Sequence, residues 1–334
     1  MNQIKPFQKG SLRVLVIVKE TYLELVQAAN DEHQLREIAK KSPGLESVAE
    51  SHAQHTATLN HVTEVLSELA IHYSVVNRRD PDLHEKLAQA NLVITLGGDG
   101  TFLTASHDIK DGTPVLGVNS APITSFGHYC VCDRSTFTEV FTSVIENQRH
   151  AVALLRLKLS IDGNPLGELV LNEVLVAHEQ PAGTSRYHIT VDGITEIHKC
   201  SGLLVSTPAG STGFLRSEGG PVLPISGTQF AYLERAPFLR FGEEHQFRSG
   251  LMQRGEKLEI VSQMQDGRIY IDGDHLQHAF PRGSVLTIEA AESSINAFVD
   301  PACHEPYITA QVQSQKQSTN SSFQDWVKRL LKIS

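Results

Sequence analysis

The sequence predicts an α/β N-terminal domain with a parallel sheet, followed by a β-rich C-terminal domain resembling an all-β sandwich. Up to about residue 148, short β-branched apolar runs alternate with helical patterns, as in a parallel sheet with crossover helices. Beyond residue 148, short runs of alternating polarity are separated by turn residues, as in antiparallel strands. With 334 residues and 40% hydrophobic side chains, the chain is long enough to form two cores.

The predicted strands of the first domain are continuous apolar runs, as strands buried on both faces require. They cover 12–18, 73–77, 91–96 and 113–119. Helical patterns lie between them. One covers 22–41 and another covers 82–90. Between these two, Leu59, Val62, Leu66 and Leu69 recur at helical spacing and lie on one face of a helix. We expect this domain to cover residues 1–148.

The second domain is expected to cover 149–311. Two alternating runs flank Asp162-Gly163-Asn164, which predicts a β-hairpin. Further alternating runs follow at 186–194, 202–207, 257–263, 268–276 and 284–291. Residues 312–334 are expected to form a polar linker and a short amphipathic helix. That helix begins at a capping box, Ser322 with Asp325, and would dock on the protein itself or on a second subunit.

Composition excludes several classes of protein. A formal net charge of -9 argues against general nucleic-acid binding, which needs a surplus of basic residues. The four cysteines show no metal-ligand spacing, and the N-terminus shows no secretion signal. No apolar run approaches the roughly 20 residues of a membrane span. We therefore expect a cytoplasmic protein with no membrane partner.

The stretch Gly97-Gly98-Asp99-Gly100 directly follows the predicted strand 91–96. In a parallel sheet, ligands bind beyond the carboxyl ends of the strands. Glycines allow backbone N–H groups to approach an anion, and Thr101 begins a helix whose N-terminus favours phosphate. A carboxylate beside phosphates is unfavourable unless a cation or a removable proton compensates for it. Asp99 therefore indicates metal coordination, activation of a hydroxyl, or both, and an ordinary strand-to-helix turn is the alternative.

A second candidate stretch is rich in small hydroxylated residues and glycine. Residues 202–224 carry an apolar strand into such a run, which suits close approach to a ribose or a pyrophosphate. Asn172 and Glu173 occupy adjacent strand positions and therefore point to opposite faces. One of the two is expected to bond a ligand or a neighbouring loop.

These stretches resemble the NAD kinase family. The motifs "GGDGT", "NE" and "STPAGSTGF…S…GGP" occur in the family's order and spacing, and "IYIDGDH" takes the place of a further family "DG". The resemblance covers roughly residues 12–289, and the set of motifs is highly specific. It implies transfer of a phosphoryl group from a nucleoside triphosphate to the 2′-hydroxyl of the adenosine ribose of NAD(H), at an active site in the cleft between the domains.

The resemblance implies that Asp99 is the catalytic carboxylate near this hydroxyl. The cofactor-binding set comprises Gly97, Gly98, Gly100, Thr101, Asn119, Asn172, Glu173, Ser201, Thr212, Gly213, Phe214, Ser217 and Asp272. Phe214 stands where many members have tyrosine, and Ser201 where the bacterial majority has aspartate. These departures, with the segment 117–130, resemble the divergent branch that includes organellar, often NADH-using enzymes. The choice between NAD and NADH stays open.

Phosphoryl transfer implies Mg²⁺ with ATP as the donor, and Asp99 as the acceptor of the hydroxyl proton. Arg216 and Arg186 are candidates to counter phosphate charge, or are surface charges. The rival readings are a diacylglycerol- or sphingoid-type lipid kinase and a non-catalytic nucleotide-binding regulator. Self-association as a dimer or tetramer is carried over from the family.

Other chemical groups have simpler explanations. His52, His55 and His61 lack a carboxylate or cysteine in register, so we expect helix-surface residues. Residues 128–130 follow a strand-end turn and could line the cleft, although packing is the simpler role. Asp272 with Asp274 could be a metal pair, but aspartate before glycine is commoner in a hairpin turn.

Overall fold

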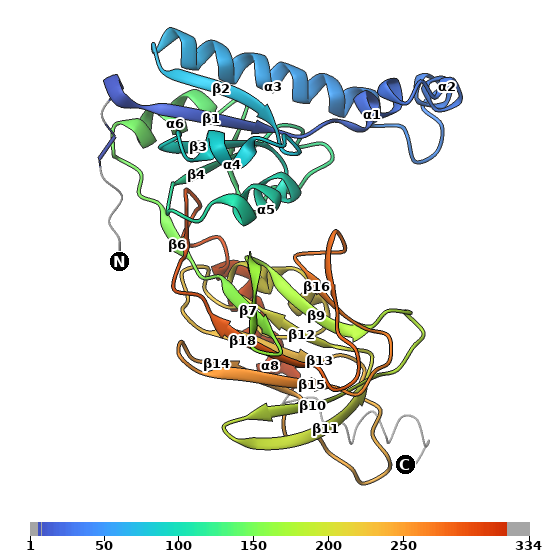
Figure 1. The fold of residues 1–334 in the computed structure, drawn as a ribbon. Helices are drawn as coiled ribbons and strands as arrows, with labels where there is room; N and C mark the ends of the chain where they lie inside the picture. The colour runs from blue at the N-terminus through green and yellow to red at the C-terminus, as the bar shows by residue number, and fades with distance from the viewer. Residues whose placement is uncertain (1–5, 8, 319–334) are drawn as a thin grey trace. The chain divides into compact units, whose positions relative to one another are not determined.

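The computed structural model describes residues 6, 7 and 9–318 and divides into two compact units (Figure 1). Among the described residues, those up to Leu154 and Glu292–Asp300 form the first unit. Leu155–Ala291 and the residues from Pro301 onward form the second. None of the helices in the described part of the chain combines the length and the apolar character that a bilayer span requires.

Within the described residues, the first unit holds a seven-stranded sheet in the order β2-β1-β3-β4-β19-β6, with β5 also paired to β4. Among these described strands, every neighbouring pair is parallel except β19 with β6. The strands are β1 Arg13–Val18, β2 His72–Asn77, β3 Leu92–Gly97, β4 Val115–Asn119, β5 Cys130–Asp133, β6 Val152–Leu154 and β19 Ile295–Ala297. The expected parallel α/β domain is confirmed.

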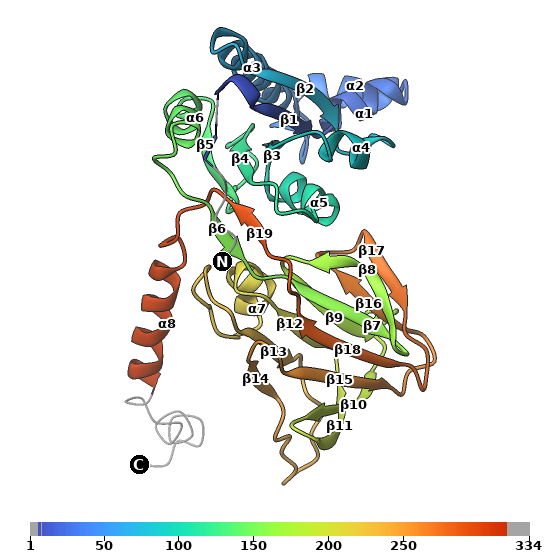
Figure 2. The same cartoon turned by 60° about the vertical axis from the view of Figure 1, so that its left-hand side comes forward.

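The helices of the first unit cover both faces of this sheet. α3 and α6 pack on one face, and α4 and α5 lie on the other (Figure 2). The bounds are η1 Lys9–Ser11, α1 Tyr22–Ala28, α2 Glu32–Ala39, α3 Val48–Glu68, α4 Leu83–Leu87, α5 Asp99–Asp108 and α6 Phe137–Ile145. Coverage on both faces explains why β3 is buried at every position.

One predicted helix is in fact two. The stretch 22–41 is interrupted after α1, where Asn30 takes a positive φ of 53°. Asp31 then caps α2, because its side chain accepts a hydrogen bond from Gln34 N at 2.9 Å. An asparagine in the left-handed region followed by an aspartate cap therefore ends one helix and starts the next.

The second unit is a β-sandwich. In its described residues, one six-stranded sheet has the order β11-β10-β15-β18-β7-β8 and the other β14-β13-β12-β9-β16-β17. Neighbouring strands in both sheets are antiparallel, and alternate residues of both sheets enter one shared core. The expected β-rich fold is confirmed, as is the hairpin at Asp162-Gly163, where both residues have positive φ.

The strands of the sandwich are short. In chain order they are β7 Leu157–Ile161, β8 Asn164–Val170, β9 Glu173–His178, β10 Ser185–Val191, β11 Ile194–Cys200, β12 Leu203–Ser206, β13 Phe230–Glu234, β14 Ser249–Met252, β15 Lys257–Ser262, β16 Gly267–Ile271, β17 Leu276–Ala279 and β18 Val285–Ala290. The helical segments are η2 Ala209–Thr212, α7 Phe214–Ser217 and α8 Glu305–Ser318. Residues 312–318, expected as a polar linker, are the last part of α8. The amphipathic helix expected from Ser322 lies outside the described residues.

Candidate functional site

The glycine turn joins the central strand β3 to α5. Gly98 is the N-cap of α5 in extended conformation, and Asp99 is its first residue. From β1 the chain continues to β2 on one side, whereas β3 and β4 lie on the other side, so the strand order reverses between β1 and β3. In α/β sheets, ligands bind beyond the carboxyl ends of the strands at such a reversal. The turn is thus placed where the sequence predicted a site, at the N-terminus of a ten-residue helix.

The carboxylate of Asp99 is held by a residue thirty positions away. Its Oδ1 accepts a hydrogen bond from the backbone N–H of Tyr129 at 2.9 Å. The Tyr129 ring stacks on Phe102 of α5, with centroids 4.7 Å apart and planes 9° from parallel. In the described part of the chain, Asp99 Oδ2 makes no hydrogen bond. One oxygen therefore fixes the side chain, and the other remains available to a ligand.

The glycines of the turn have different physical causes. A Cβ on Gly97 would lie 2.1 Å from Thr101 Oγ1, and one on Gly98 would lie 2.1 Å from Ser125 Oγ. Close packing against these side chains therefore disfavours a larger residue at either position. A Cβ on Gly100 would meet nothing within 4 Å. Thr101 Oγ1 is buried and has no hydrogen-bond partner among the described residues, an unfavourable state that a ligand would relieve.

Asn119 ends β4, directly beside Gly97 of β3 in the register. Its Nδ2 donates to Ser125 O at 3.0 Å, and its Oδ1 accepts from Ala121 N at 3.3 Å. The side chain of Asn119 therefore shapes the loop that carries Ser125 to Gly98. We expected Asn119 to contact the cofactor. In the structure, its side chain bonds to the backbone of this loop.

His55 corrects one prediction. We expected it on a helix surface, but its side chain lies inside α3's packed face and is 3% exposed. Its Nδ1 lies 2.8 Å from Ser120 Oγ, at the start of the same loop. Burial, followed by the charge of Lys19, lowers the pKa of His55 to about 4, so the ring is neutral at pH 7.

In the second unit, Asp272 organises a backbone segment. Its carboxylate accepts hydrogen bonds from the N–H groups of Leu171, Asn172 and Glu173 at 2.9, 2.7 and 3.1 Å. Asp272 itself has a positive φ of 50° before Gly273, as the hairpin interpretation predicted. The structure thus brings three of the predicted site residues together, with Asp272 as the anchor.

Glu173 is the titratable group of this cluster. Burial, followed by the negative charge of Asp272, raises the pKa of Glu173 to about 7. The guanidinium of Arg156, which is 0% exposed, interacts electrostatically with Asp272. Burial lowers the pKa of Arg156 to about 10, against the attraction of that carboxylate. Arg156 carried no sequence signal, because it lies at the start of an alternating polar and apolar run like any other strand residue.

The small-residue segment packs directly on Asn172. Thr207 N and Ser206 Oγ donate to Asn172 O at 2.9 and 3.2 Å. A Cβ on Gly210 would lie 2.4 Å from the same carbonyl oxygen, so only glycine fits. Thr212 ends η2 and is buried. The stretch around Asn172 and Glu173 and the small-residue stretch 202–224 therefore pack against each other.

Arg235, which was not among the predicted site residues, contacts two of them, Phe214 and Ser201. Its guanidinium lies 4.7 Å from the centroid of the Phe214 ring, a cation–π contact that a phenyl ring provides without a hydroxyl. Its backbone O accepts from Ser201 N at 2.9 Å. Ser217 Oγ instead donates to Gly213 O within α7 at 3.0 Å. Ser201 and Ser217 are both exposed.

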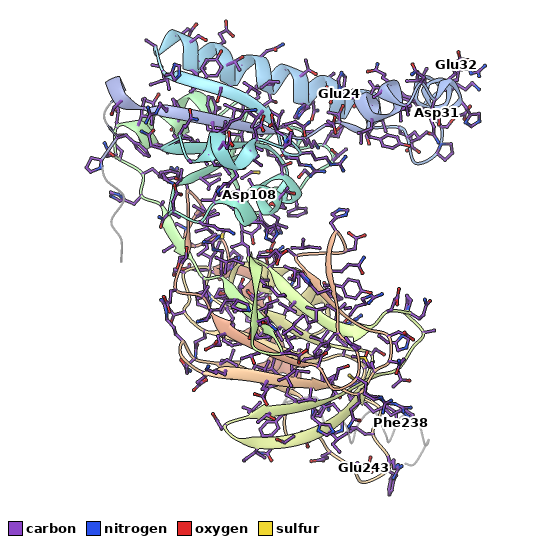
Figure 3. The ribbon with its side chains drawn as sticks, viewed as in Figure 1. Glu24, Asp31, Glu32, Asp108, Phe238 and Glu243 are labelled. Carbon is purple, nitrogen blue, oxygen red and sulfur yellow. The ribbon has the colours of Figure 1, made fainter. Side chains whose placement is uncertain are left out.

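The two cationic candidates lie on the surface. Arg216 has its guanidinium 4.8 Å from the centroid of the Tyr307 ring of α8. Arg186 is an exposed residue of β10. Figure 3 shows the wider setting of side chains, with Asp108 at the end of α5 that lies opposite the glycine turn.

Comparison with known families gives two overlapping matches. Residues 11–149 match the ATP-NAD kinase N-terminal domain, and residues 144–231 match the ATP-NAD kinase C-terminal domain. The first contains the glycine turn and the second contains the segment from Asn172 to Ser217. Asp272 lies beyond both.

Several curated proteins are similar to this chain. A probable NADH kinase of Oryza sativa subsp. japonica is 32% identical over 257 residues, which are 71% of this chain and 78% of that protein. An NADH kinase of Arabidopsis thaliana is 28% identical over 291 residues, 78% and 88% of the two chains. An NAD kinase of Methanoculleus marisnigri is 34% identical over 185 residues, 55% and 65%.

Two solved structures share the fold. An NAD kinase from Archaeoglobus fulgidus in complex with ATP has a TM-score of 0.65 at 23% identity, covering 91% of this chain and 99% of that one. A yeast NADH kinase complexed with NADH has a TM-score of 0.67 at 16% identity, covering 90% and 87%.

Proposed function

The chain belongs to the NAD kinase family, and on this premise we propose that it transfers a phosphoryl group from ATP to the 2′-hydroxyl of the adenosine ribose of NAD(H). The products are NADP(H) and ADP. The observation that carries the proposal is the carboxylate of Asp99, fixed at the head of α5 by Tyr129 N–H with its second oxygen unbonded. The lipid-kinase and regulator alternatives gain no support from the family matches.

Asp99 is the proposed general base. As the bond from the 2′-oxygen to the γ-phosphorus forms, the bond from that phosphorus to the β-bridging oxygen breaks, and ADP leaves. The hydroxyl proton moves to Asp99 Oδ2. Since the transition state of phosphoryl transfer is loose, this proton transfer completes late. Tyr129 N–H is a positioning group, because it fixes Oδ1 and so directs the other oxygen.

The glycine turn is the proposed contact for the transferred phosphates. The N-terminus of α5 favours negative charge, and the open space at Gly100 allows close approach to the backbone. The buried hydroxyl of Thr101, which has no partner among the described residues, would gain one from a bound phosphate or water.

Mg²⁺ is the proposed metal that accompanies ATP. Mg²⁺ would be held chiefly by the phosphate oxygens of ATP and by water, as is usual for this ion, which leaves Asp99 Oδ2 to accept the hydroxyl proton. When bound, the ion would neutralise charge on the phosphates of ATP.

The second unit is the proposed holder of NAD(H). Its donors and acceptors gather where Asp272 fixes Asn172 and Glu173 against the small-residue segment. Phe214 supplies an aromatic face backed by Arg235. That these groups and Asp99 act together in a cleft between the domains stays a prediction. Preference for NAD or NADH, assembly as a dimer or tetramer and a cytoplasmic location stay predictions as well.

The test is product formation by the purified chain with ATP and Mg²⁺. Parallel reactions contain NAD, NADH or diacylglycerol, and mass spectrometry identifies the phosphorylated product. We expect NADP or NADPH. Phosphatidate would overturn the proposal in favour of a lipid kinase, and nucleotide binding without any product would favour a regulator.

Asp99→Asn tests the base. We expect kcat to fall about 10²- to 10⁴-fold while the dissociation constant for NAD(H) stays within a few fold. Asp108→Asn is the matched control, since it changes the same residue type at the other end of α5 and should retain turnover. Near-normal kcat in Asp99→Asn would show that Asp99 is not the base.

A further inference from the structure

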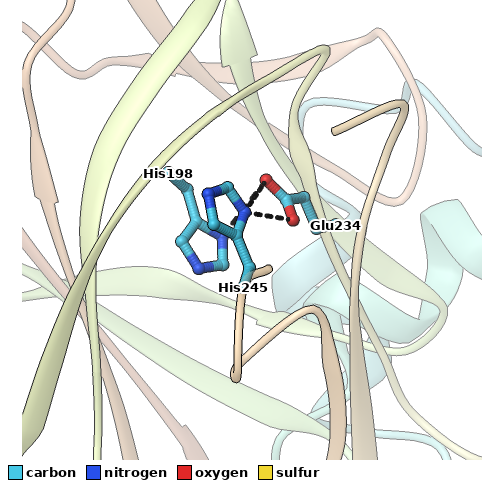
Figure 4. Close-up of side chains that lie close together, drawn as sticks. All are labelled: His198, Glu234 and His245. Carbon is cyan, nitrogen blue, oxygen red and sulfur yellow. Dashed lines mark hydrogen bonds and ion pairs between the residues drawn. The ribbon is translucent and has the colours of Figure 1, made fainter. Parts of the chain in front are cut away.

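A cluster of metal-ligating side chains lies in the second unit and has no part in the proposed reaction. It consists of His198 on β11, Glu234 at the end of β13 and His245 in the loop 235–248 (Figure 4). Their ligand atoms all lie within 4.8 Å of one another. His198 and Glu234 are buried, and the side chain of His245 is 12% exposed.

The separations between the ligand atoms are close to those around a tetrahedral ion. His198 Nδ1 lies 3.3 Å from Glu234 Oε1, and His245 Nδ1 lies 2.9 Å from Glu234 Oε2. Zinc–nitrogen bonds of about 2.0–2.1 Å give tetrahedral ligand–ligand distances of about 3.3 Å. The ligand atoms are therefore already close to one another, and the change needed to accept an ion is a reorientation of the stacked rings.

A second carboxylate supports the cluster from behind. His198 Nε2 lies 2.9 Å from Glu196 Oε2, so the ring is held between Glu196 on one side and Glu234 on the other. The same Glu196 accepts from the backbone N–H groups of Gln246 and Phe247, each at 3.0 Å. A carboxylate behind a histidine is the common support of metal ligands, because it fixes the tautomer and the ring orientation.

The charge balance favours a divalent cation. Two carboxylates, Glu196 and Glu234, face the two imidazoles in a largely buried place, and uncompensated negative charge is unfavourable there. One divalent ion between the ligand atoms would neutralise this charge.

We propose that His198, Glu234 and His245 bind one divalent transition-metal ion, with zinc the best match. Two imidazole nitrogens and one carboxylate are a common zinc ligand set, and Mg²⁺, which prefers oxygen, does not suit it. Solvent takes the fourth position beside the partly exposed His245. Since the lone pair of Nδ1 lies in the ring plane, binding tilts the stacked rings apart, and His245 can tilt because it lies in a loop.

The ion would cross-link three separate pieces of the sandwich. β11 is an edge strand of one sheet, β13 belongs to the other sheet, and His245 belongs to the loop 235–248 that follows β13. That loop carries the exposed side chains of Phe238 and Phe241. The role of the metal is therefore structural, closing one end of the sandwich and tethering the loop.

The site is separate from the proposed nucleotide contacts. Along β13, Phe230, Tyr232 and Glu234 face the core between the sheets, whereas Ala231 and Leu233 face the other side together with Leu215. Arg235, whose guanidinium contacts Phe214, lies on the same side as Ala231 and Leu233. The proposal thus does not depend on kinase activity.

The experiment measures zinc binding by the full-length chain. Protein purified without metal is titrated with Zn²⁺ against a competing chelator, and bound metal is counted by mass spectrometry. We expect one zinc ion per chain and a higher Tm with zinc than with EDTA. His245→Gln should abolish both effects. Glu196→Gln should weaken binding about 10- to 100-fold. His278→Gln, which removes another histidine paired with a carboxylate at 3.6 Å, should change neither.

A second measurement uses only the unmodified chain and so does not depend on how the variants fold. Diethylpyrocarbonate modifies accessible imidazoles, and peptide mass spectrometry reports each site. Saturating zinc should protect His245 and leave His278 as reactive as before. The absence of zinc uptake by the unmodified chain, equal binding by His245→Gln, or no protection of His245 would each overturn the proposal.

Discussion

At the scale of single residues, the carboxylates of this protein differ mainly in how many N–H groups they receive. Asp272 receives three and so anchors the backbone of residues 171–173. Glu173, close by, is desolvated by burial and also lies near the negative charge of Asp272. The pKa of Glu173 is therefore raised to about 7, and its proton equilibrium becomes coupled to folding.

That coupling predicts the pH dependence of stability. Below about pH 4.5, Glu173 is protonated in both states and contributes nothing. Between there and about pH 7, the unfolded chain loses the proton while the folded chain keeps it, so the free energy of unfolding falls as pH rises. Above that range both states have lost the proton, and the free energy of unfolding falls no further.

Glu173→Gln removes this pH-dependent fall in the free energy of unfolding. We expect the free energy of unfolding to rise by about 2–3 kcal/mol at pH 8, with a smaller gain at pH 5. Urea unfolding at both values measures it. Glu179→Gln, on the surface beside Arg268, is the control and should shift stability by less than about 0.5 kcal/mol. Parallel pH profiles for Glu173→Gln and the unmodified chain would contradict the assigned pKa.

At the scale of elements, the turn between β3 and α5 combines structural and functional glycines. Gly97 is required by the approach of Thr101, whereas Gly100 faces open space inside the first turn of a helix. A glycine in a helix costs about 0.5–1 kcal/mol relative to alanine, so folding alone does not explain Gly100.

Two alanine substitutions separate these causes. Gly97→Ala should lower the free energy of unfolding by about 1–3 kcal/mol, because its Cβ meets Thr101 Oγ1. Gly100→Ala should leave stability unchanged or raise it by up to about 1 kcal/mol, while raising KM for ATP. Denaturant unfolding and steady-state kinetics give the two readouts. Normal KM in Gly100→Ala would mean that phosphate does not approach this residue.

At the scale of the whole molecule, the first unit is not a continuous piece of chain. Glu292–Asp300 return to it after the sandwich is complete, and β19 pairs with both β4 and β6. We expected these residues in the second domain, as part of 149–311. Ile295 is 0% exposed in its sheet, which shows that the returning strand is part of the core.

Removing the returning strand should therefore destabilise the first unit. A fragment of residues 1–154 leaves β4 without its β19 neighbour and uncovers apolar surface. The same fragment joined through a Gly/Ser linker to residues 292–300 restores the pairing. We expect a higher Tm by circular dichroism for the joined fragment. Equal Tm values would show that β19 contributes little to the stability of this unit.

The sequence by itself determined the two fold classes, the glycine turn, the hairpins and the family, because these depend on local periodicity, turn chemistry and motif spacing. Tertiary structure alone decided which groups meet: Tyr129 N–H with Asp99, Asp272 with the Asn172 backbone, His55 with Ser120, and Arg235 with Phe214. It also decided the return of β19 to the first sheet and the convergence of His198, Glu234 and His245. The physical reason is that these contacts join residues far apart in the chain. Their formation depends on strand order and on the face to which each side chain points, and neither leaves a local pattern in the sequence.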